Sequence, residues 1–314
     1  MSILIKSGVN LKKITNYKIG GKADYIVSPK NLAEILESIS WAKKNKIRKI
    51  FILGSGTNVL FSDEGYRGLI IIPKLNYFKK EGNEVIVGGG VLVKDFLNFL
   101  IKNGLEGFEW AGGLPGTIGG AVRGNAGCFG GETKDNLVSV TSVNFKSTPI
   151  RIIKRKKQEC NFDYRSSIFK IKSNEIILEC RFKFINGNKS VIKKIVNDHI
   201  KYRNSRHPMD KPNIGSIFKN TPVKNLAKKM ALSLTHKIKH DPFPVVPTVY
   251  FIAEANLRGK RHGGAMISDK HPNFIVNYNN KAKASDVIKL MKFVKSTLKK
   301  KFNINVEPEV MIVK

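Results

Sequence analysis

The stretch AGGLPGTIGGAVRGNAGCFGGE, residues 111–132, decides the fold class because nine of its residues are glycine. Glycine adopts backbone conformations that other residues avoid, and it lets another group come close to the main chain. The stretch contains no Walker A loop, which requires GK[ST], and no GxGxxG that opens a helix after a strand. Turns alone explain such a density of glycine poorly, so it indicates a ligand-binding loop.

A second glycine loop, GSGTN at 54–58, directly follows an apolar strand predicted over 49–53. Successive backbone N–H groups in such a loop can converge on an anion, and Thr57 and Asn58 add side-chain donors. The same residues also suit a tight turn between strands, and this loop alone does not decide between the two interpretations. Together, the two loops indicate a long diphosphate ligand, such as a dinucleotide, bound outside the Rossmann scheme.

Hydrophobic periodicity predicts an α+β chain around these loops. Helices are expected at 32–44, 93–103, 191–204, 223–234 and 284–301, and strands at 23–28, 49–53, 69–72, 84–87, 137–145, 175–184, 273–277 and 305–313. The elements fall into three segments, 1–75, 76–205 and 206–314.

The net charge of +32 comes from 56 Lys and Arg against 24 Asp and Glu. Only 11 of the 56 are arginine, the residue that proteins favour for bidentate phosphate and base contacts. The lysines are spread along the whole chain, as a compositional bias would produce. We therefore expect no nucleic-acid partner, although a basic field would help to attract an anionic small substrate.

The three cysteines, Cys128, Cys160 and Cys180, form no CxxC pair and are odd in number. This usage is typical of a protein in a reducing cytoplasm. No apolar run approaches the roughly 20 residues of a membrane helix, so we expect no membrane insertion. His236 and His240 are four residues apart, but Asp241-Pro242 would end any helix there. No metal site is predicted.

Seven segments, in order from one end of the chain to the other, resemble the UDP-N-acetylenolpyruvoylglucosamine reductase (MurB) family of bacterial peptidoglycan synthesis. They are TNYKIGGKADYIVSP (15–29), FILGSGTNVLFSD (51–63), WAGGLPGTIGGAVRGNAG (110–127), FDYRSSIFK (162–170), IGSIFKN (214–220), GGAMISDKHPNFIVN (263–277) and VEPEV (306–310). The short length is similar to that of the family's type II members.

The resemblance implies an FAD-binding fold of the vanillyl-alcohol-oxidase type. Residues 1–75 and 76–205 would form two lobes that hold FAD non-covalently, and 206–314 a lobe that covers the UDP-sugar substrate. Hydride would pass from NADPH through FAD to C3 of an enolpyruvyl ether, and a proton would reach C2. The family also implies a cytoplasmic enzyme, which we expect to be a monomer.

Three residues match the family's catalytic positions. Arg165 in DYRSS would clamp the substrate carboxylate with its guanidinium fork. Ser216 in GSIFKN would donate the proton, which requires a polarised, dry setting because a free serine is a poor acid. Glu309 in VEPEV matches the catalytic glutamate. The expected substrate contacts are Tyr164, Lys219 and Asn220.

The expected FAD contacts lie in the two glycine loops. In the first loop they are Gly54, Ser55, Gly56, Thr57 and Asn58; in the second they are Gly113, Leu114, Pro115, Gly116, Thr117, Ile118, Gly119, Gly120, Asn125, Ala126 and Gly127.

The chain departs from the family at Arg123, Gly124 and Cys128, and most of all at 234–251, which is longer than usual. Three prolines predict an extended loop there. The roles of His262 and His271 stay open. Two other hypotheses also stay open: a flavoprotein of the same fold that acts on a different substrate, and a basic nucleic-acid-binding protein. A visible spectrum separates the latter from both enzymes.

Overall fold

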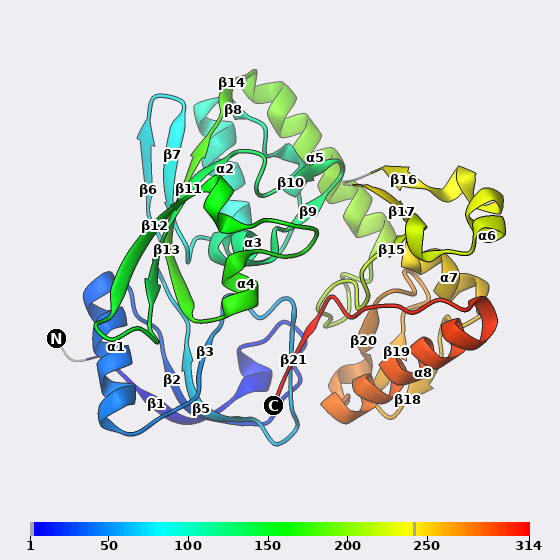
Figure 1. Ribbon diagram of the computed structural model, residues 1–314, viewed down its shortest axis with the longest axis horizontal. Helices are drawn as coiled ribbons and strands as arrows, with labels where there is room; N and C mark the ends of the chain where they lie inside the picture. The colour runs from blue at the N-terminus through cyan, green and yellow to red at the C-terminus, as the bar shows by residue number, and fades with distance from the viewer. Residues whose placement is uncertain (1–2, 241–242) are drawn as a thin grey trace. The chain divides into compact units, whose positions relative to one another are not determined.

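The computed structural model describes residues 3–240 and 243–314, which form two compact units (Figure 1). The first unit holds Ala23–Ser55 and Arg67–Tyr202 together with the N-terminal residues up to Val9. The second holds Asn10–Lys22, Gly56–Tyr66 and Arg203–Lys314. The first glycine loop is therefore continuous from one unit into the other. The expected division at residues 75 and 205 stays a prediction.

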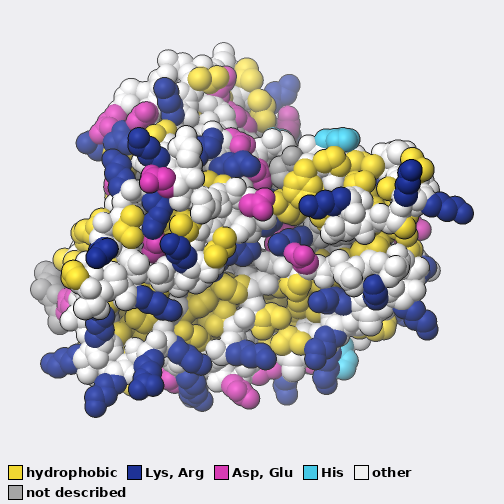
Figure 2. Space-filling view, in the orientation of Figure 1, with side chains coloured by type: hydrophobic (Ala, Val, Ile, Leu, Met, Phe, Trp, Pro, Cys, Tyr) yellow, Lys and Arg dark blue, Asp and Glu magenta, His cyan; other side chains and the backbone are white. Residues whose placement is uncertain are grey.

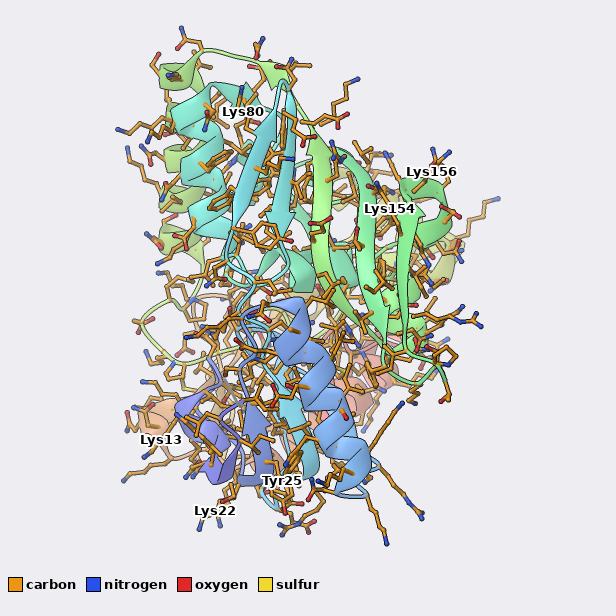
Figure 3. All side chains as sticks on the ribbon, turned by 90° about the vertical axis from the view of Figure 1, so that its left-hand side faces the viewer. Lys13, Lys22, Tyr25, Lys80, Lys154 and Lys156 are labelled. Atoms are coloured by element: carbon orange, nitrogen blue, oxygen red, sulfur yellow. The ribbon has the colours of Figure 1, made fainter. Side chains whose placement is uncertain are left out.

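The first unit begins with a four-stranded sheet and the helix α1. The strand order is β1-β2-β5-β3, with β3 parallel to β5. Asn31 starts α1 by accepting a hydrogen bond from the Glu34 amide, and the helix buries Ile35 and Ile39 completely. The ring of Tyr25 lies edge-on to Trp41, 5.1 Å between centroids (Figure 3). The bounds are β1 Lys6–Asn10, β2 Lys22–Val27, α1 Leu32–Lys44, β3 Ile50–Ile52 and β5 Tyr66–Ile71.

A five-stranded antiparallel sheet forms the rest of the first unit, in the order β12-β11-β13-β7-β6. Helices α2 and α3 lie beside it (Figure 1), and a cluster of buried aromatic rings, including Phe96, Phe108 and Phe182, fills the core. The bounds are β6 Phe78–Glu81, β7 Glu84–Gly88, α2 Val93–Asn103, β8 Leu105–Glu106, α3 Ile118–Gly124, β9 Gly127–Cys128, β10 Gly131–Glu132, β11 Leu137–Asn144, β12 Arg151–Lys156, α4 Ile168–Lys172, β13 Glu175–Lys183, β14 Ile185–Asn186 and α5 Lys189–Arg206.

The second unit packs helix α8 onto the strands β18 and β19. Tyr17 is fully buried in this unit, and its hydroxyl donates to the Ile275 carbonyl at 2.8 Å. Asp63 caps α8 by accepting hydrogen bonds from the amides of Ala284 and Ser285. The bounds are β4 Val59–Phe61, β15 Thr221–Pro222, α6 Lys228–Ser233, β16 Lys239–His240, β17 Pro244–Val246, α7 Thr248–Glu254, β18 Arg261–His262, β19 Ala265–Ile267, β20 Ile275–Asn277, α8 Ala284–Phe302 and β21 Met311–Val313.

Three sequence predictions differ from the structure in the second unit. The helix predicted over 223–234 is broken, because Leu226 and Ala227 are extended between a 3₁₀ turn, Val223–Asn225, and α6. The strand predicted over 305–313 is confined to β21, since Pro308 has no amide for a ladder and makes only an isolated bridge. The predicted loop 234–251 contains β16, β17 and the first turn of α7; Asp241-Pro242 lies outside the described residues.

Basic side chains form no single dominant patch on the one face that Figure 2 shows. On the face shown in Figure 2, Lys and Arg are spread widely, with Asp and Glu between them. Lys80, Lys154 and Lys156 project from the five-stranded sheet (Figure 3). No helix within residues 3–240 and 243–314 is long and apolar enough to cross a membrane.

Candidate active site

The first glycine loop turns sharply between β3 and β4, and Gly56 makes that turn possible. Its φ of 65° is in the left-handed region. A Cβ at this position would lie 3.0 Å from the Thr15 Cα and 3.3 Å from the Ile14 carbonyl oxygen. The Asn16 amide donates to the Gly56 carbonyl at 3.3 Å. Glycine at 56 is therefore required for close packing on the 14–16 turn as well as for its backbone conformation.

We expect Gly56→Val to give a folded but colourless protein, because a branched side chain would force the loop away from Thr15 and displace the amides of residues 55–57. Gly82→Val is the matched control: Gly82 has a similar φ of 59°, but a Cβ there meets nothing within 4 Å. Flavin content per folded protein is the measurement. Normal flavin in Gly56→Val, or an equal loss in Gly82→Val, would contradict this role.

The second glycine region contains a helix that the sequence did not predict. Thr117 begins α3 by accepting a hydrogen bond from the Gly120 amide. Gly119 lies against Gly89, donating to its carbonyl at 2.9 Å, and a Cβ on Gly119 would also be 2.9 Å from that oxygen. The glycines thus allow a short helix to pack against the main chain of the 88–91 turn, which outweighs their low helix propensity.

The two glycine loops meet within the first unit. A Cβ on Gly54 would be only 2.7 Å from Thr117 Oγ1, so the 54–55 segment lies directly on the start of α3. Pro115 and Gly116 precede this contact, and Gly116 has a φ of 124°. Residues 54–55 of the first loop therefore lie against the second loop in the first unit.

Several amides in these loops are left without partners. In the first unit, the N–H groups of Ser55, Gly116 and Thr117 donate no hydrogen bond to another described residue. Backbone amides rarely stay unpaired without water or a ligand. A diphosphate supplies the anionic acceptors that such donors require, so the residues present fit the phosphate portion of FAD.

The predicted FAD residues Asn125, Ala126 and Gly127 hold the turn that carries Arg165. Asn125 is fully buried with a φ of 41°, and its side-chain Nδ2 donates to the Asp163 carbonyl at 3.1 Å. Ser167 adds a hydrogen bond from its hydroxyl to the Arg123 carbonyl at 2.7 Å. The DYRSS segment is thereby fixed to the C-terminal end of α3.

Arg165 lies in a two-residue turn closed by hydrogen bonds between Asp163 and Ser166. Its φ of 54° costs ~1–2 kcal/mol for a residue with a Cβ, and strain of this kind clusters at functional sites. Nη2 donates to the Gly127 carbonyl at 2.6 Å, and the guanidinium lies 4.9 Å from the Tyr164 ring centroid. Arg165 is thus held rather than free on the surface, with Tyr164 beside it.

Ser216 follows Gly215, whose φ is 81°. The next residues are clamped by Asn273: its carbonyl accepts from the Ile217 amide at 2.8 Å, and its side chain bonds both the N–H and the C=O of Phe218. The Ser216 hydroxyl makes no hydrogen bond to a described residue. The backbone therefore fixes the position of the hydroxyl without occupying it.

Glu309 lies on a segment that pairs with the residues after Ser216 through an isolated bridge between Phe218 and Pro308. Its amide donates to the Ile217 carbonyl at 2.8 Å, and its own carbonyl accepts from the Asn58 side chain at 3.2 Å. Glu309 is thus bonded to Asn58 and to the residue that follows Ser216. The Lys219 amide donates to the Glu307 carbonyl at 3.0 Å, Lys219 Nζ lies 3.1 Å from a Glu307 carboxylate oxygen, and the half-buried Asn220 follows.

The sequence did not single out Asn273 or Glu132, both of which organise predicted residues. Asn273 belongs to the matched segment 263–277, so its buried amide was detectable only as part of a motif. Glu132 ends the glycine stretch and is its only acid. The presence of a single acidic residue in a glycine-rich stretch was the signal that could have pointed to Glu132.

The histidines do not supply a proton donor. Burial, with a contribution from His207, lowers the pKa of His271 to about 3, and burial lowers that of His207 to about 4. Both rings are therefore neutral at neutral pH. His262 is exposed in β18. Within residues 3–240 and 243–314, no group of three or more His, Cys, Asp or Glu could hold a metal.

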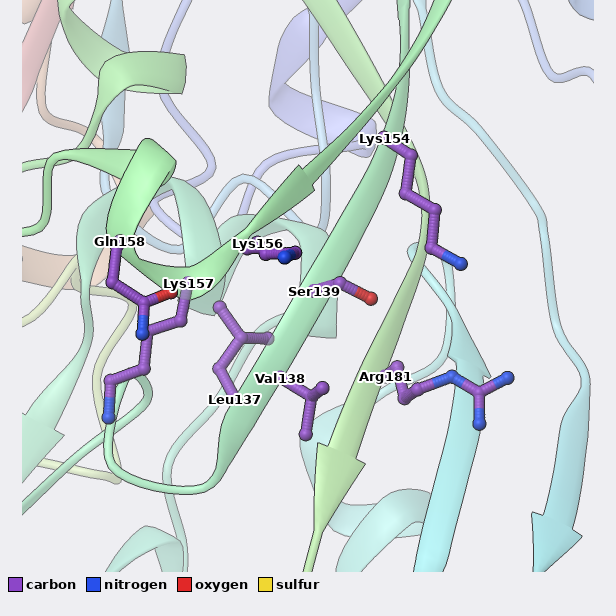
Figure 4. Close-up of a pocket in the computed structure, with 8 residues that line it drawn as sticks. All are labelled: Leu137, Val138, Ser139, Lys154, Lys156, Lys157, Gln158 and Arg181. Atoms are coloured by element: carbon purple, nitrogen blue, oxygen red, sulfur yellow. The ribbon is translucent and has the colours of Figure 1, made fainter.

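Two shallow cavities lie away from the predicted residues. One, of about 410 Å³, opens on the five-stranded sheet between Ser139, Lys154, Lys156 and Arg181 (Figure 4). The other, of about 280 Å³, is lined by residues of β18 and α8 in the second unit. Neither contains a residue predicted for the site, so the cavities add no candidate for the reaction.

Comparison with known proteins identifies both parts of the chain. A family described as UDP-N-acetylenolpyruvoylglucosamine reductase, C-terminal domain, matches residues 207–313. A family described as FAD binding domain matches residues 23–152. The UDP-N-acetylenolpyruvoylglucosamine reductase of Clostridium novyi is 35% identical over 98% of this chain and 92% of its own length. That of Fervidobacterium nodosum is 36% identical over 95% of this chain and 88% of its own.

A solved structure resembles the whole molecule. UDP-N-acetylenolpyruvylglucosamine reductase (MurB) from Thermus caldophilus has a TM-score of 0.77 and 26% identity, with complete coverage of both chains. The predicted α+β class, the FAD-binding fold and the cofactor are confirmed by these matches. The chain belongs to the UDP-N-acetylenolpyruvoylglucosamine reductase family, and it is a flavin-dependent oxidoreductase.

Proposed function

We propose that this protein catalyses the NADPH-dependent, FAD-mediated reduction of UDP-N-acetylenolpyruvoylglucosamine to UDP-N-acetylmuramate in peptidoglycan precursor synthesis. The observation that carries the proposal is the hydrogen bond from the Glu309 amide to the carbonyl of Ile217, the residue after Ser216, which joins these two segments of the second unit, in a chain that its reductase relatives match over nearly its full length. Neither alternative hypothesis, a different flavoprotein substrate or a nucleic-acid partner, requires that pairing.

The glycine loops are the proposed holders of FAD. Within the first unit, the amides of Ser55, Gly116 and Thr117, which donate to no described residue, fit its diphosphate. When bound, the flavin supplies the hydride chemistry that no amino-acid side chain offers. The chain itself must bind the UDP-sugar, orient its enolpyruvyl group and deliver one proton.

Arg165 is the proposed ligand of the enolpyruvyl carboxylate. A planar guanidinium binds a carboxylate through two parallel hydrogen bonds and stabilises negative charge that develops beside it during hydride addition. The contacts of Arg165 with Gly127 and Tyr164 reduce the number of orientations that the guanidinium samples. Pre-organisation of this kind lowers the cost of reaching the reactive geometry.

Ser216 is the proposed donor of the proton to the enolpyruvyl C2, with Glu309 as its partner. Hydrogen bonds of the next residue, Ile217, to Asn273 and Glu309 hold the main chain beside Ser216, while its hydroxyl makes no bond to a described residue. Lys219, Asn220 and Tyr164 are proposed to contact the rest of the substrate. Purified protein that oxidises NADPH only when the enolpyruvyl sugar nucleotide is present would support this function; oxidation without it would favour another substrate.

We expect acid denaturation to release all the flavin, because the cofactor is proposed to be non-covalent. The 54–58 loop carries no histidine or cysteine to form a covalent bond. The only thiol of the second loop, Cys128 Sγ, is 3.1 Å from the Trp110 carbonyl oxygen, to which it donates. Visible absorbance of the filtrate after precipitation is the measurement, and colour retained on the pelleted chain would contradict the proposal.

We also propose that the enzyme is a cytoplasmic monomer with three lobes, 1–75 and 76–205 for the flavin and 206–314 for the substrate. The cysteines are compatible with a reducing compartment: Cys160 and Cys180 are buried and free. Light scattering of the purified protein tests the monomer, since the mass of a dimer would rule it out.

A further inference from the structure

Glu132 is a buried carboxylate that the proposed mechanism does not use. Its side chain is only 5% exposed. No backbone amide or hydroxyl of a described residue donates to either carboxylate oxygen. A charge buried in this way is costly unless cations compensate it. The groups around Glu132 therefore indicate the role of its charge.

Two cations flank the carboxylate. The Lys134 ammonium lies 2.8 Å from Oε2, and Nη1 of Arg165 lies 3.8 Å from Oε1. The Glu132 carboxylate raises the pKa of Lys134, so the lysine is charged at neutral pH. Asp135 and Asp163 also contribute to raising that pKa, so Glu132 is one of three carboxylates near Lys134.

A single rung of the β9–β10 hairpin supplies two contacts of the Arg165 guanidinium, which also lies beside the Tyr164 ring. Glu132 is the register partner of Gly127, whose carbonyl accepts the 2.6 Å hydrogen bond from Nη2. The following residues tie this rung to the loop predicted to bind FAD: Thr133 bonds the Ala126 carbonyl, and the Lys134 amide bonds the Asn125 side chain. The orientation of Arg165 is thus linked to that loop.

We propose that Glu132 is a positioning residue: its buried carboxylate holds the Arg165 guanidinium against the 125–127 loop and thereby sets the affinity for the substrate's carboxylate. The inference rests on the proposed function, because it assumes that Arg165 binds that group. Gly127 fixes one nitrogen of the fork and Glu132 attracts the other. Without Glu132 the guanidinium would lose the attraction on Nη1, and a misplaced fork loses its bidentate geometry.

Calorimetry on the oxidised holoenzyme tests the proposal without turnover. Two ligands are compared: UDP-N-acetylenolpyruvoylglucosamine, which carries the carboxylate, and UDP-N-acetylglucosamine, which lacks it. The isosteric variant Glu132→Gln should bind the first ligand at least about tenfold more weakly than wild type. Its affinity for the second ligand should be unchanged.

Glu175→Gln is the matched control. Glu175 is also buried in the first unit, and it pairs with both terminal nitrogens of Arg155, at 2.5 and 2.9 Å. Its loss should lower the melting temperature and leave the ratio of the two ligand affinities unchanged. Glu132→Asp keeps the charge on a shorter side chain and should show the same selective loss at a smaller size. If Glu132→Gln does not retain flavin, the ligand affinities of Glu132→Asp alone test the proposal.

Equal weakening of both ligands, or no weakening, would overturn the positioning role. Failure of the proposed function looks different: the wild-type enzyme would then not favour the enolpyruvyl ligand, and its reduced flavin would not be reoxidised by it. If the wild-type enzyme favours the enolpyruvyl ligand and the Glu132 variants keep the same ratio of the two ligand affinities, only the role of Glu132 is contradicted.

Discussion

Replacement of Ser216 by alanine is expected to slow reoxidation of the reduced enzyme by the enolpyruvyl substrate at least about a hundredfold, because positioned acid catalysis is worth about 10²–10⁴-fold. Reduction of the flavin by NADPH should keep its wild-type rate, since that half-reaction delivers no proton to carbon. Stopped-flow absorbance of the flavin measures the two steps separately.

Fold damage would not mimic this result. The Ser216 hydroxyl makes no hydrogen bond to a described residue, so alanine removes no structural contact. Ser296→Ala, at an exposed position on α8, serves as the control and should leave both steps unchanged. If both half-reactions of Ser216→Ala slow equally, the residue shapes a shared pocket; if neither slows, the proton comes from elsewhere.

Replacement of Arg165 by lysine should lower kcat/KM for the enolpyruvyl substrate by about 10²–10³-fold, the usual effect of losing one transition-state donor. Lysine keeps the charge but has no planar fork, so it cannot bind a carboxylate through two parallel hydrogen bonds. It also cannot donate to the Gly127 carbonyl and reach the substrate at the same time. Steady-state kinetics with each substrate varied is the measurement.

Arg155→Lys provides the comparison, because Arg155 makes a buried ion pair with Glu175 in the same unit and has no proposed contact with substrate. It should reduce thermal stability and leave kcat/KM near wild type. An Arg165→Lys enzyme whose kcat/KM stays within about threefold of wild type would show that the fork is not required.

The sequence predicts α1 and α2 correctly from residues within and beside each helix. Helix α1 begins and ends where predicted, because Asn31 caps it and its apolar stripe faces the core. Helix α2 likewise ends at Gly104, in the left-handed conformation at φ 62°. In both cases the sequence encodes the boundary within a few residues.

Elements that depend on distant partners were missed or misjudged. The short helix α3 is stabilised by its close packing on Gly89, which no local propensity reports. Within the candidate site, motif resemblance found Arg165, Ser216 and Glu309, but not what holds them. The Asn273 clamp joins residues more than fifty positions apart, and the charge on Glu132 gains meaning only from its neighbours in space.

The parallel pairing of β4 with β21 has a consequence for biosynthesis. Val59 pairs with Met311 and Phe61 with Val313, so β4 leaves the ribosome long before its partner exists. Until Met311–Val313 are synthesised, the nascent chain carries an apolar strand without its partner, the kind of surface that recruits other chains. A ribosome that stalls before codon 311 leaves the second unit without β21.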